Sequence, residues 1–418
     1  MLRNKLVYFI ATIPLLFSVV SCKNTDNKVA EEKLVNNEKI VPPIAPAVPS
    51  KPQSAEKPTI PQAQENIAAL SPETAPMSAK FTNTAKFLAG MKVDENSPLA
   101  SHQKNQAWKS HAAFFDNVWG RLEKQQLSEI RQWANKELKS VNQSSEVIFY
   151  PFSGPDFLYS YSFFPQGRTY VLAGLEPVGS LPNIEKMSRA EIDRNLQGID
   201  QSLRAILKWS FFLTNNMRVD LSQKGVLPIL FVFLARTNNQ ILDVQYIGLQ
   251  KDGTTKVLEK GNKENLIKGV KINFVPKGET QTRSLYYFSA DLSNSALNKT
   301  PEFNKFVESL GKSTTYLKAA SYLLHYQQFS NIRNLILSQS TSLLQDDSGI
   351  PVKDFDRSKW KLQFYGNYTH PISLFSNEYQ SSLKSIYQSK TNVKPLNFGI
   401  GYRYQVNNSN LMLAIRKE

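Results

Sequence analysis

The sequence has 418 residues and a mass of 47.4 kDa, enough for one large domain or two ordinary ones whose core is stable without cross-links. Its single cysteine excludes an intrachain disulfide, a thiol redox pair and a zinc site built from cysteines. The formal net charge is +15, and Arg3 and Lys5 contribute two of these charges. Residues 23–80 have no net charge, because seven Lys balance one Asp and six Glu. The remaining net charge of +13 therefore belongs to the residues after 80.

Residues 1–21 have the layout of a secretory signal peptide. They combine a basic start, a short apolar run over residues 6–20 and a small residue just before Cys22. The window VVSC at residues 19–22 resembles the lipobox of bacterial lipoproteins, in which Leu more often stands at the position of Val19. The resemblance implies cleavage before Cys22, attachment of diacylglyceryl to its sulfur, and acylation of the new amino terminus. An ordinary signal peptide with a chance cysteine is the alternative.

Such acyl chains would make the membrane the first partner of this protein. Each buried CH₂ contributes about 0.8 kcal/mol, so two or three chains hold a protein at a membrane almost permanently. The residue directly after Cys22 is Lys23 and not an Asp. By resemblance to the sorting rule of enterobacterial lipoproteins, this implies transport to the outer membrane. We therefore expect a lipid-anchored protein of the bacterial cell envelope.

Residues 22–80 are predicted to form a disordered tether. The stretch contains nine prolines among Ala, Lys, Glu, Gln and Asn, and it has no aromatic residue after Cys22. It cannot bury enough apolar surface to offset the entropy lost on ordering. The folded body is therefore expected to stand off the membrane.

Residues 81–418 are predicted to form one globular domain that opens with a helical part over residues 81–140. Apolar residues recur there at spacings of three, four and seven, which is typical of one face of an amphipathic helix: Trp108, His111, Ala112, Phe115, Trp119 and Leu122. Strands are expected at residues 146–150, 157–164 and 169–175, followed by a long helix over residues 188–215. The run GVLPILFVFLA at residues 225–235 is too short to span a bilayer, so it is predicted to be a buried element.

The rest of the chain predicts an antiparallel meander and then alternating short helices and strands. The meander runs are ILDVQYIGL, KVLEK, VKINFVP and RSLYYFSADL, separated by turn signals such as KDG and PKG. In the last third we expect helices at 302–310, 331–337 and 378–387, and strands at 314–324, 360–365, 398–404 and 411–415. The fold class is therefore predicted to be α+β, with a largely antiparallel sheet packed against helices on one side.

No complete catalytic signature is present. The string LGKST lacks the earlier glycine of a phosphate-binding loop, and the two SxxK strings lack the partner motifs of penicillin-binding proteins. The four His are widely separated, so neither a metal site nor a cofactor is expected.

Four unusual loops remain as candidate sites, because binding residues concentrate on loops held by a rigid scaffold. They are YPFSGPDF with Tyr150 and Asp156, GLEPVG with Glu176, LQDDSGIP with Asp346 and Asp347, and FYGNYTHPI with Tyr365, Tyr368 and His370.

Two roles are open for these loops. Asp156 and Glu176 are the candidate acid and base of a hydrolase, with His370 as an outside candidate, because two carboxylates in different environments can hold different protonation states. The other five residues are candidate binding residues: Tyr150, Tyr365, Tyr368, Asp346 and Asp347. The alternative is that these carboxylates cap helices or bond to turn backbone.

The four loop strings also resemble segments of a group of uncharacterised exported bacterial proteins, which implies a shared domain but no activity. Our first hypothesis is a domain that binds an envelope component, either an anionic envelope polymer or another envelope protein, and not nucleic acid. The scattered Lys and Arg are also compatible with an ordinary solvated surface. The alternative is an envelope hydrolase that acts on a glycan or peptide with loop carboxylates as acid and base.

Overall fold

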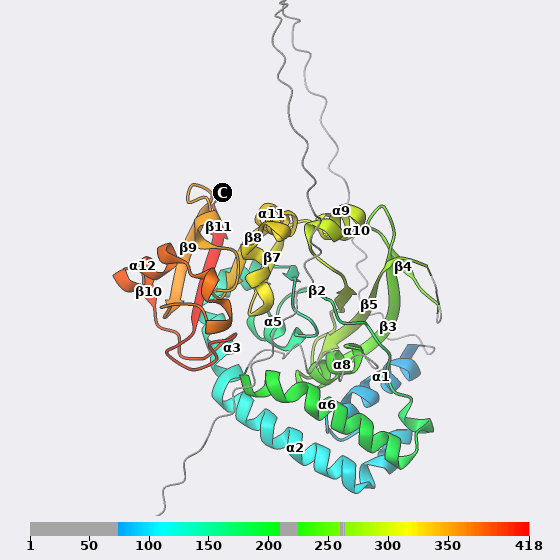
Figure 1. Ribbon diagram of the computed structural model, residues 1–418. Helices are drawn as coiled ribbons and strands as arrows, with labels where there is room; N and C mark the ends of the chain where they lie inside the picture. Colours follow the sequence, from blue (N-terminus) through cyan, green and yellow to red (C-terminus); the bar gives the residue numbers. More distant parts are fainter. Residues whose placement is uncertain (1–73, 210–224, 260–261, 263, 418) are drawn as a thin grey trace, which may run out of the picture. The chain divides into compact units, whose positions relative to one another are not determined.

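The computed structural model describes residues 74–209, 225–259, 262 and 264–417. These residues belong to one compact unit (Figure 1). The predicted signal peptide, Cys22 and most of the predicted tether lie outside the described residues.

A single mixed sheet runs through the described part of the chain. Neighbouring strands follow the order β10 (Val393–Lys394), β9 (Trp360–Gly366), β11 (Asn410–Arg416), β8 (Ser340–Gln345), β7 (Ser313–Leu317), β1 (Val147–Tyr150), β2 (Thr169–Gly174), β6 (Arg283–Ser289), β5 (Ile267–Pro276), β3 (Asn239–Leu249) and β4 (Thr255–Val257). The five central strands, from β8 to β6, are mutually parallel. Antiparallel pairs flank them on both sides, and the edge strand β10 is parallel to β9.

Both faces of the sheet are buried. In β1, Ile148 and Tyr150 contribute to one core and Phe149 to the other, as the alternation of side chains in a strand requires. The first core is covered by α1 (Thr74–Leu88), α2 (Gln106–Leu122), α3 (Ser128–Glu137), α4 (Lys139–Ser144), α5 (Phe157–Phe163), α6 (Arg189–Trp209) and α8 (Leu227–Arg236). The second core is covered by α9 (Asn294–Lys299), α10 (Glu302–Ser309), α11 (Ser330–Gln339) and α12 (Ser381–Ser389).

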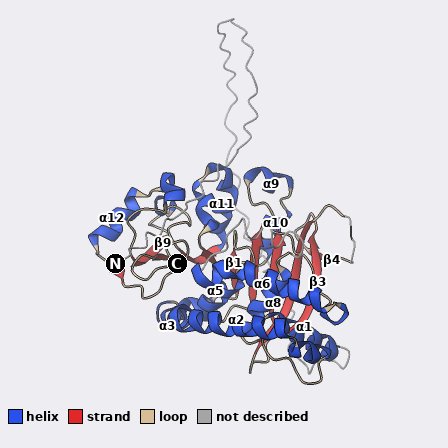
Figure 2. Ribbon diagram, turned by 60° about the horizontal axis from the view of Figure 1, so that its bottom comes forward, coloured by secondary structure: helices blue, strands red, loops and turns tan. Residues whose placement is uncertain are grey.

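The α+β prediction with a sheet packed against helices is confirmed, but the helices lie on both faces rather than on one (Figures 1 and 2). The cause is the parallel centre of the sheet, since parallel strands need crossover connections that cover both faces. Shorter helical turns complete the connections at η1 (Pro98–Lys104), the π-helical η2 (Glu123–Leu127), η3 (Ile184–Lys186), η4 (Ala320–His325), η5 (Gln327–Phe329), η6 (Val352–Asp354) and η7 (Ser373–Glu378).

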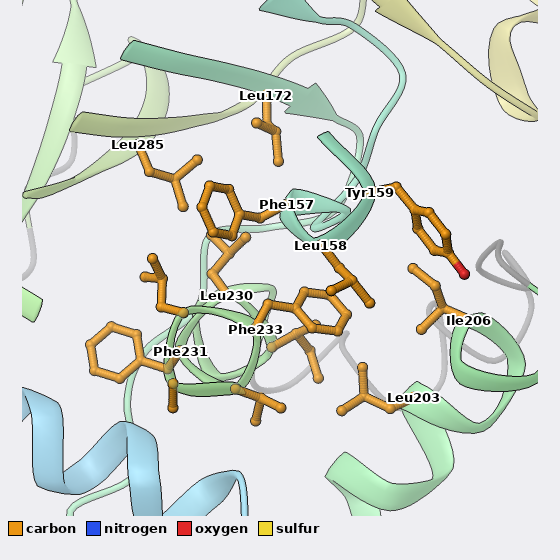
Figure 3. Packing of buried hydrophobic residues seen from close by; sticks show 14 of the residues in the cluster. Phe157, Leu158, Tyr159, Leu172, Leu203, Ile206, Leu230, Phe231, Phe233 and Leu285 are labelled. Carbon is orange, nitrogen blue, oxygen red and sulfur yellow. The ribbon is translucent and has the colours of Figure 1, made fainter. Parts of the chain in front are cut away.

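The run predicted as a buried element is the central helix of the first core. Every residue of α8 from Leu227 to Ala235 is buried, and Figure 3 shows Leu230, Phe231 and Phe233 between the sheet and the outer helices. Pro228 is accommodated because it stands in the first turn, where no partner is needed for a backbone N–H.

The prediction of a strand at residues 157–164 was wrong, because this segment forms the helix α5. Asp156 begins it as an N-cap, and its side chain accepts a hydrogen bond from the backbone N–H of Tyr159. Six of its seven residues are buried. A segment buried on all sides shows neither the helical nor the strand period of apolar residues, so the sequence pattern did not distinguish the two.

Several other boundaries differ from the prediction. The strand expected at 314–324 ends at Leu317, and the chain continues into η4 with Ala319 at a φ of +58°. Residues 398–404 form a loop that contains only an isolated bridge between Ile400 and Arg403, not a strand.

The first helix begins earlier than the predicted start of the domain. The helix α1 starts at Thr74, where the sequence predicted the end of the tether, because Ser78 is buried and donates a hydrogen bond to the carbonyl of Ile241 at 2.8 Å. The strands β3, β5 and β6 form the expected meander, while β4 pairs on the outer side of β3. The last residues of the helix predicted at 188–215 lie outside the described residues.

Candidate functional site

The connections of the central strands reverse direction between β1 and β7. From β1 the chain passes through α5 on the first face to β2, the neighbour of β1. From β7 it passes through α11 on the second face to β8, which lies beside β7 on the side away from β1. The two strands are adjacent and parallel. This is the topological switch point of an α/β sheet, where the carboxyl ends of strands form a crevice that commonly holds a ligand.

A buried ion pair bridges this switch point. Nζ of Lys318, which follows β7, lies 2.6 Å from Oδ2 of Asp156, which follows β1. Only 2% of the Lys318 side chain and 3% of the Asp156 side chain are exposed. The Lys318 ammonium also lies 3.8 Å from the centre of the Tyr159 ring, in a cation–π contact. Burial lowers the pKa of Lys318, and Asp156 opposes this.

The carboxylate of Asp156 has two further donors. The Tyr150 hydroxyl donates to Oδ2 at 3.1 Å, and the Tyr159 N–H donates to Oδ1 at 3.2 Å. Burial and the Asp156 charge raise the pKa of Tyr150 well above its usual range, so its hydroxyl stays protonated and donates. The whole group is therefore paired and hydrogen-bonded, which is the condition for keeping charges away from water.

The two acidic residues after β8 extend this cluster. Asp346 accepts hydrogen bonds from the backbone N–H of Ala319 at 3.2 Å and of Ser348 at 3.0 Å. Asp347 accepts from the Tyr322 hydroxyl at 2.5 Å and from the Asn410 amide at 2.9 Å. Burial and the neighbouring Asp347 raise the pKa of Asp346 to about 7.

A loop of the carboxyl-terminal region covers the cluster. Gly401 has a φ of +64°, and a Cβ atom at this position would collide with Oδ2 of Asp346 and would lie 3.4 Å from Cγ of Lys318. The next residue, Tyr402, stacks parallel to the Tyr322 ring with 6.3 Å between ring centres. Glycine is therefore required for the covering loop to approach the carboxylate.

An open polar pocket adjoins the covered cluster. It has a volume of about 430 Å³ and is lined by His325, Gln327, Arg333, Pro351, Lys353, Asp354, Asn377, Glu378, Tyr379, Gln380, Ser381 and Ser382. Two residues connect it to the cluster. The Gln380 amide donates to the carbonyl of Asp347 at 3.1 Å, and the His325 ring packs edge-on against Tyr322 at 5.3 Å.

The structure brings together five of the eight candidate site residues of the body. Tyr150, Asp156, Asp346 and Asp347 belong to the cluster. Tyr368 accepts a hydrogen bond from the backbone N–H of Gln380, and burial raises its pKa to about 12.

In the described part of the chain, no hydrogen bond or ion pair joins the other three candidates to the charged groups of the cluster. Tyr365 faces the first core, where its hydroxyl donates to Glu137 at 2.9 Å. His370 is exposed, and its Nδ1 lies 2.7 Å from the Arg403 guanidinium.

Glu176 follows β2, and a Cβ atom at Gly174, the last residue of that strand, would collide with Oε2 of Glu176 and touch Gly154 in the loop after β1. The Tyr287 hydroxyl donates to its backbone carbonyl at 2.8 Å, and burial raises the pKa of its carboxyl. Among the described residues, no hydrogen bond or ion pair joins Glu176 to Asp156.

Sequence reasoning missed Lys318 and Tyr322. Lys318 has one signal that could have found it: a charged residue directly after five buried strand residues, STTYL, is unusual unless it is paired. Tyr322 carries no such signal, because its partner Asp347 is 25 residues away in the sequence.

No family model, curated protein or solved structure matches this chain. Across the described residues, no group of three or more His, Cys, Asp or Glu is placed to hold a metal ion. In the same part of the chain, no helix is long and apolar enough to cross a membrane.

We expect substitution of either partner of the buried ion pair to destabilise the protein strongly. Lys318→Met removes the cation beside the buried Asp156 carboxylate, and Asp156→Asn removes the anion that lies 2.6 Å from the buried Lys318 ammonium, so each should lower the free energy of unfolding by about 3–5 kcal/mol. The double variant should lose less than the sum of the two, since neither charge remains. Chemical denaturation measures all three values.

The matched control is Lys86→Met, which breaks a partly exposed pair with Asp94 and should cost less than about 1 kcal/mol. Additive losses in the Lys318 and Asp156 double variant would contradict the coupling.

A second expectation concerns pH. The pKa of Asp346 is raised from its usual 3.8 to about 7, so the folded state binds more protons than the unfolded state between these values. Stability therefore falls as the pH rises through this window. Relative to Asp346→Asn, wild-type stability should decrease by on the order of 2–4 kcal/mol from about pH 4 to about pH 8. Denaturation at the two pH values tests this, and parallel pH profiles would contradict it.

Proposed function

We propose that this chain is a lipid-anchored protein of the bacterial cell envelope, held in the outer membrane by acyl chains on Cys22. Its α+β body binds an envelope component, an anionic polymer or another envelope protein, at the carboxyl edge of the central strands. The observation that carries the binding function is the convergence of the loops after β1, β7 and β8 at the switch point, beside an open polar pocket.

Binding is supported over catalysis by the state of the charged groups. Asp156 and Lys318 are paired with each other, and Asp346 accepts bonds from two backbone N–H groups beneath the Gly401 loop. Groups that are buried and satisfied in this way hold loops in place, and they do not meet a ligand directly. The pocket is the part of the site that is open to solvent. The excess of +13 beyond residue 80 favours an anionic partner.

The alternative function, hydrolysis of an envelope glycan or peptide, has one observation in its favour. A general acid or base works best with a pKa near the ambient pH, and the pKa of Asp346 is about 7. This role requires the loop at Gly401 to move off the carboxylate. It also moves the acid/base role from Asp156, which is paired with Lys318, to Asp346.

The anchor has a direct test in the native bacterium or a related host. Cys22→Ala removes the sulfur that would carry diacylglyceryl, so incorporation of a labelled fatty acid should be lost and the signal should stay uncleaved by the lipoprotein peptidase. Metabolic labelling and the gel mobility of the protein measure these effects. Undiminished labelling of the variant would exclude the lipid anchor. A Ser21→Ala variant, which keeps a small residue before the cysteine, should be labelled normally.

Binding is tested by affinity capture from solubilised envelopes with the full chain. The wild type should retain a defined component, and Ser382→Trp, which fills the pocket, should reduce its recovery at least tenfold. Ser389→Trp, at the other end of α12 and exposed, is the matched control and should retain it. Equal recovery by both variants would exclude the pocket. Shortened products formed by the wild type but not by Asp346→Asn would favour the hydrolase.

A further inference from the structure

We propose that residues 401–408 form a lid over the charged cluster at the switch point, and that the lid opens while the rest of the body stays folded. Opening exposes Lys318, Asp346 and Tyr316 to solvent. The inference does not rest on the binding function proposed above, because it concerns the covered cluster and not the pocket. It is carried by the shape of the loop, by the groups that the loop covers and by the backbone beneath it.

The lid is a short loop whose two ends are joined. The backbone N–H of Ile400 donates to Oγ of Ser409 at 2.8 Å, and Ile400 belongs to the first core. Between these ends, residues 404–407 are all exposed, and they include the apolar side chains of Tyr404 and Val406. A loop with few buried residues opens at a lower free-energy cost than the elements that it connects.

Side chains of the lid hold it against the neighbouring segment. The Arg403 guanidinium donates to the carbonyl of His370 and, at 3.0 Å, to that of Pro371. The buried Nε of Arg403 has no hydrogen-bond partner among the described residues, so the closed position does not fully satisfy the guanidinium. The Tyr402 ring lies 5.6 Å from the Phe375 ring, centre to centre. These contacts lie at the surface, where water can replace the hydrogen bonds that opening breaks.

The lid covers groups that are charged or unsatisfied. Gly401 packs against the side chains of Asp346 and Lys318, which are 5% and 2% exposed. The Tyr316 hydroxyl is completely buried, and burial together with the charges of Asp156 and Asp346 raises its pKa, so it stays protonated. In the part of the chain that the structure describes, this hydroxyl has no hydrogen-bond partner. Such a buried polar group is rare, and a site that takes up a ligand is one explanation for it.

The loops that carry the ion pair contain unfavourable backbone. Ala319, directly after Lys318, has a φ of +58° and a ψ of −88°. Phe152, in the loop that leads to Asp156, has a φ of +60°. Residues with a Cβ atom rarely adopt positive φ, and such strain concentrates at active sites and switch regions. The N–H of Ala319 is held by Asp346, so the strained backbone, the ion pair and the lid meet at one place.

Opening of the lid is also the movement that the hydrolase alternative requires. Asp346 cannot contact a glycan or a peptide while Gly401 lies against its carboxylate. The open pocket adjoins the same cluster through Gln380, whose amide donates to the carbonyl of Asp347. The lid therefore separates a part of the site that is always open from a part that is accessible only after a conformational change.

Acetylation of Lys318 tests the lid on the full chain in detergent. A short pulse of N-hydroxysuccinimide acetate modifies accessible amines, and peptide mass spectrometry compares Lys318 with the exposed Lys109. We expect Lys318 to react roughly a hundredfold more slowly than Lys109, at a rate that urea below the unfolding transition leaves unchanged. A local opening exposes little surface, so its equilibrium depends weakly on denaturant.

Gly401→Ala should raise the reaction rate of Lys318 at least tenfold, because its Cβ would collide with Oδ2 of Asp346 and prevent closure. Gly278→Ala is the matched control. Gly278 also has a positive φ, +86°, but an added Cβ would meet no atom of a non-neighbouring described residue within 4 Å, so the rate should change less than twofold. Tyr402→Ala removes the ring that packs on Phe375 without adding a collision. It should also raise the rate, and it decides the case if Gly401→Ala does not fold.

Other results would overturn the proposal. If the rate at Lys318 rises with urea in parallel with global unfolding, the amine is reached only in the unfolded chain and the loop is not a lid. An equal rise in Gly401→Ala and Gly278→Ala, or an unchanged rate in Tyr402→Ala, leads to the same conclusion. Capture of an envelope component through the pocket is a separate measurement, so the lid can fail while the proposed binding function stands.

Discussion

The buried ion pair between Lys318 and Asp156 is the interaction on which the arrangement of the site depends. Moving two charges out of water is costly, and the cost is offset only when both partners are well placed and fully hydrogen-bonded. Here the Tyr150 hydroxyl and the Tyr159 N–H donate hydrogen bonds to Asp156, and the Tyr159 ring contacts the Lys318 ammonium. One partner follows β1 and the other follows β7, so the pair fixes two loops whose onward connections run over opposite faces of the sheet.

The rest of the site is built on this contact in layers. Asp346 accepts a hydrogen bond from the backbone N–H of Ala319, the neighbour of Lys318. Gly401 packs against the side chains of Asp346 and Lys318. Beyond them, Tyr322 and Gln380 connect Asp347 to the pocket wall. The covered cluster therefore supports the wall of the pocket, and the pocket is open to solvent.

Two apolar cores hold the scaffold itself. The first core is built around α8, whose residues from Leu227 to Ala235 are all buried, and the second lies under α9 to α12. A sheet covered on both faces has little room for solvent at its centre, which explains why the charged groups at its carboxyl edge are so deeply buried. The same burial raises the pKa of Asp346 and lowers that of Lys318.

The sequence by itself determined features that depend on local composition and period. The apolar stripe from Trp108 to Leu122 lies on the helix α2, and the run at residues 225–235 is buried. Both features follow from the spacing and hydrophobicity of residues within one segment, which the sequence shows directly. The signal and tether predictions rest on the same kind of local evidence. Only the tertiary structure decided that residues 157–163 form a helix, that Tyr150, Asp156, Asp346 and Asp347 meet, and that Tyr365 faces the first core. Lys318 and Asp156 are 162 residues apart in the sequence. Their pairing follows from strand order and crossover direction, and no local pattern contains that information.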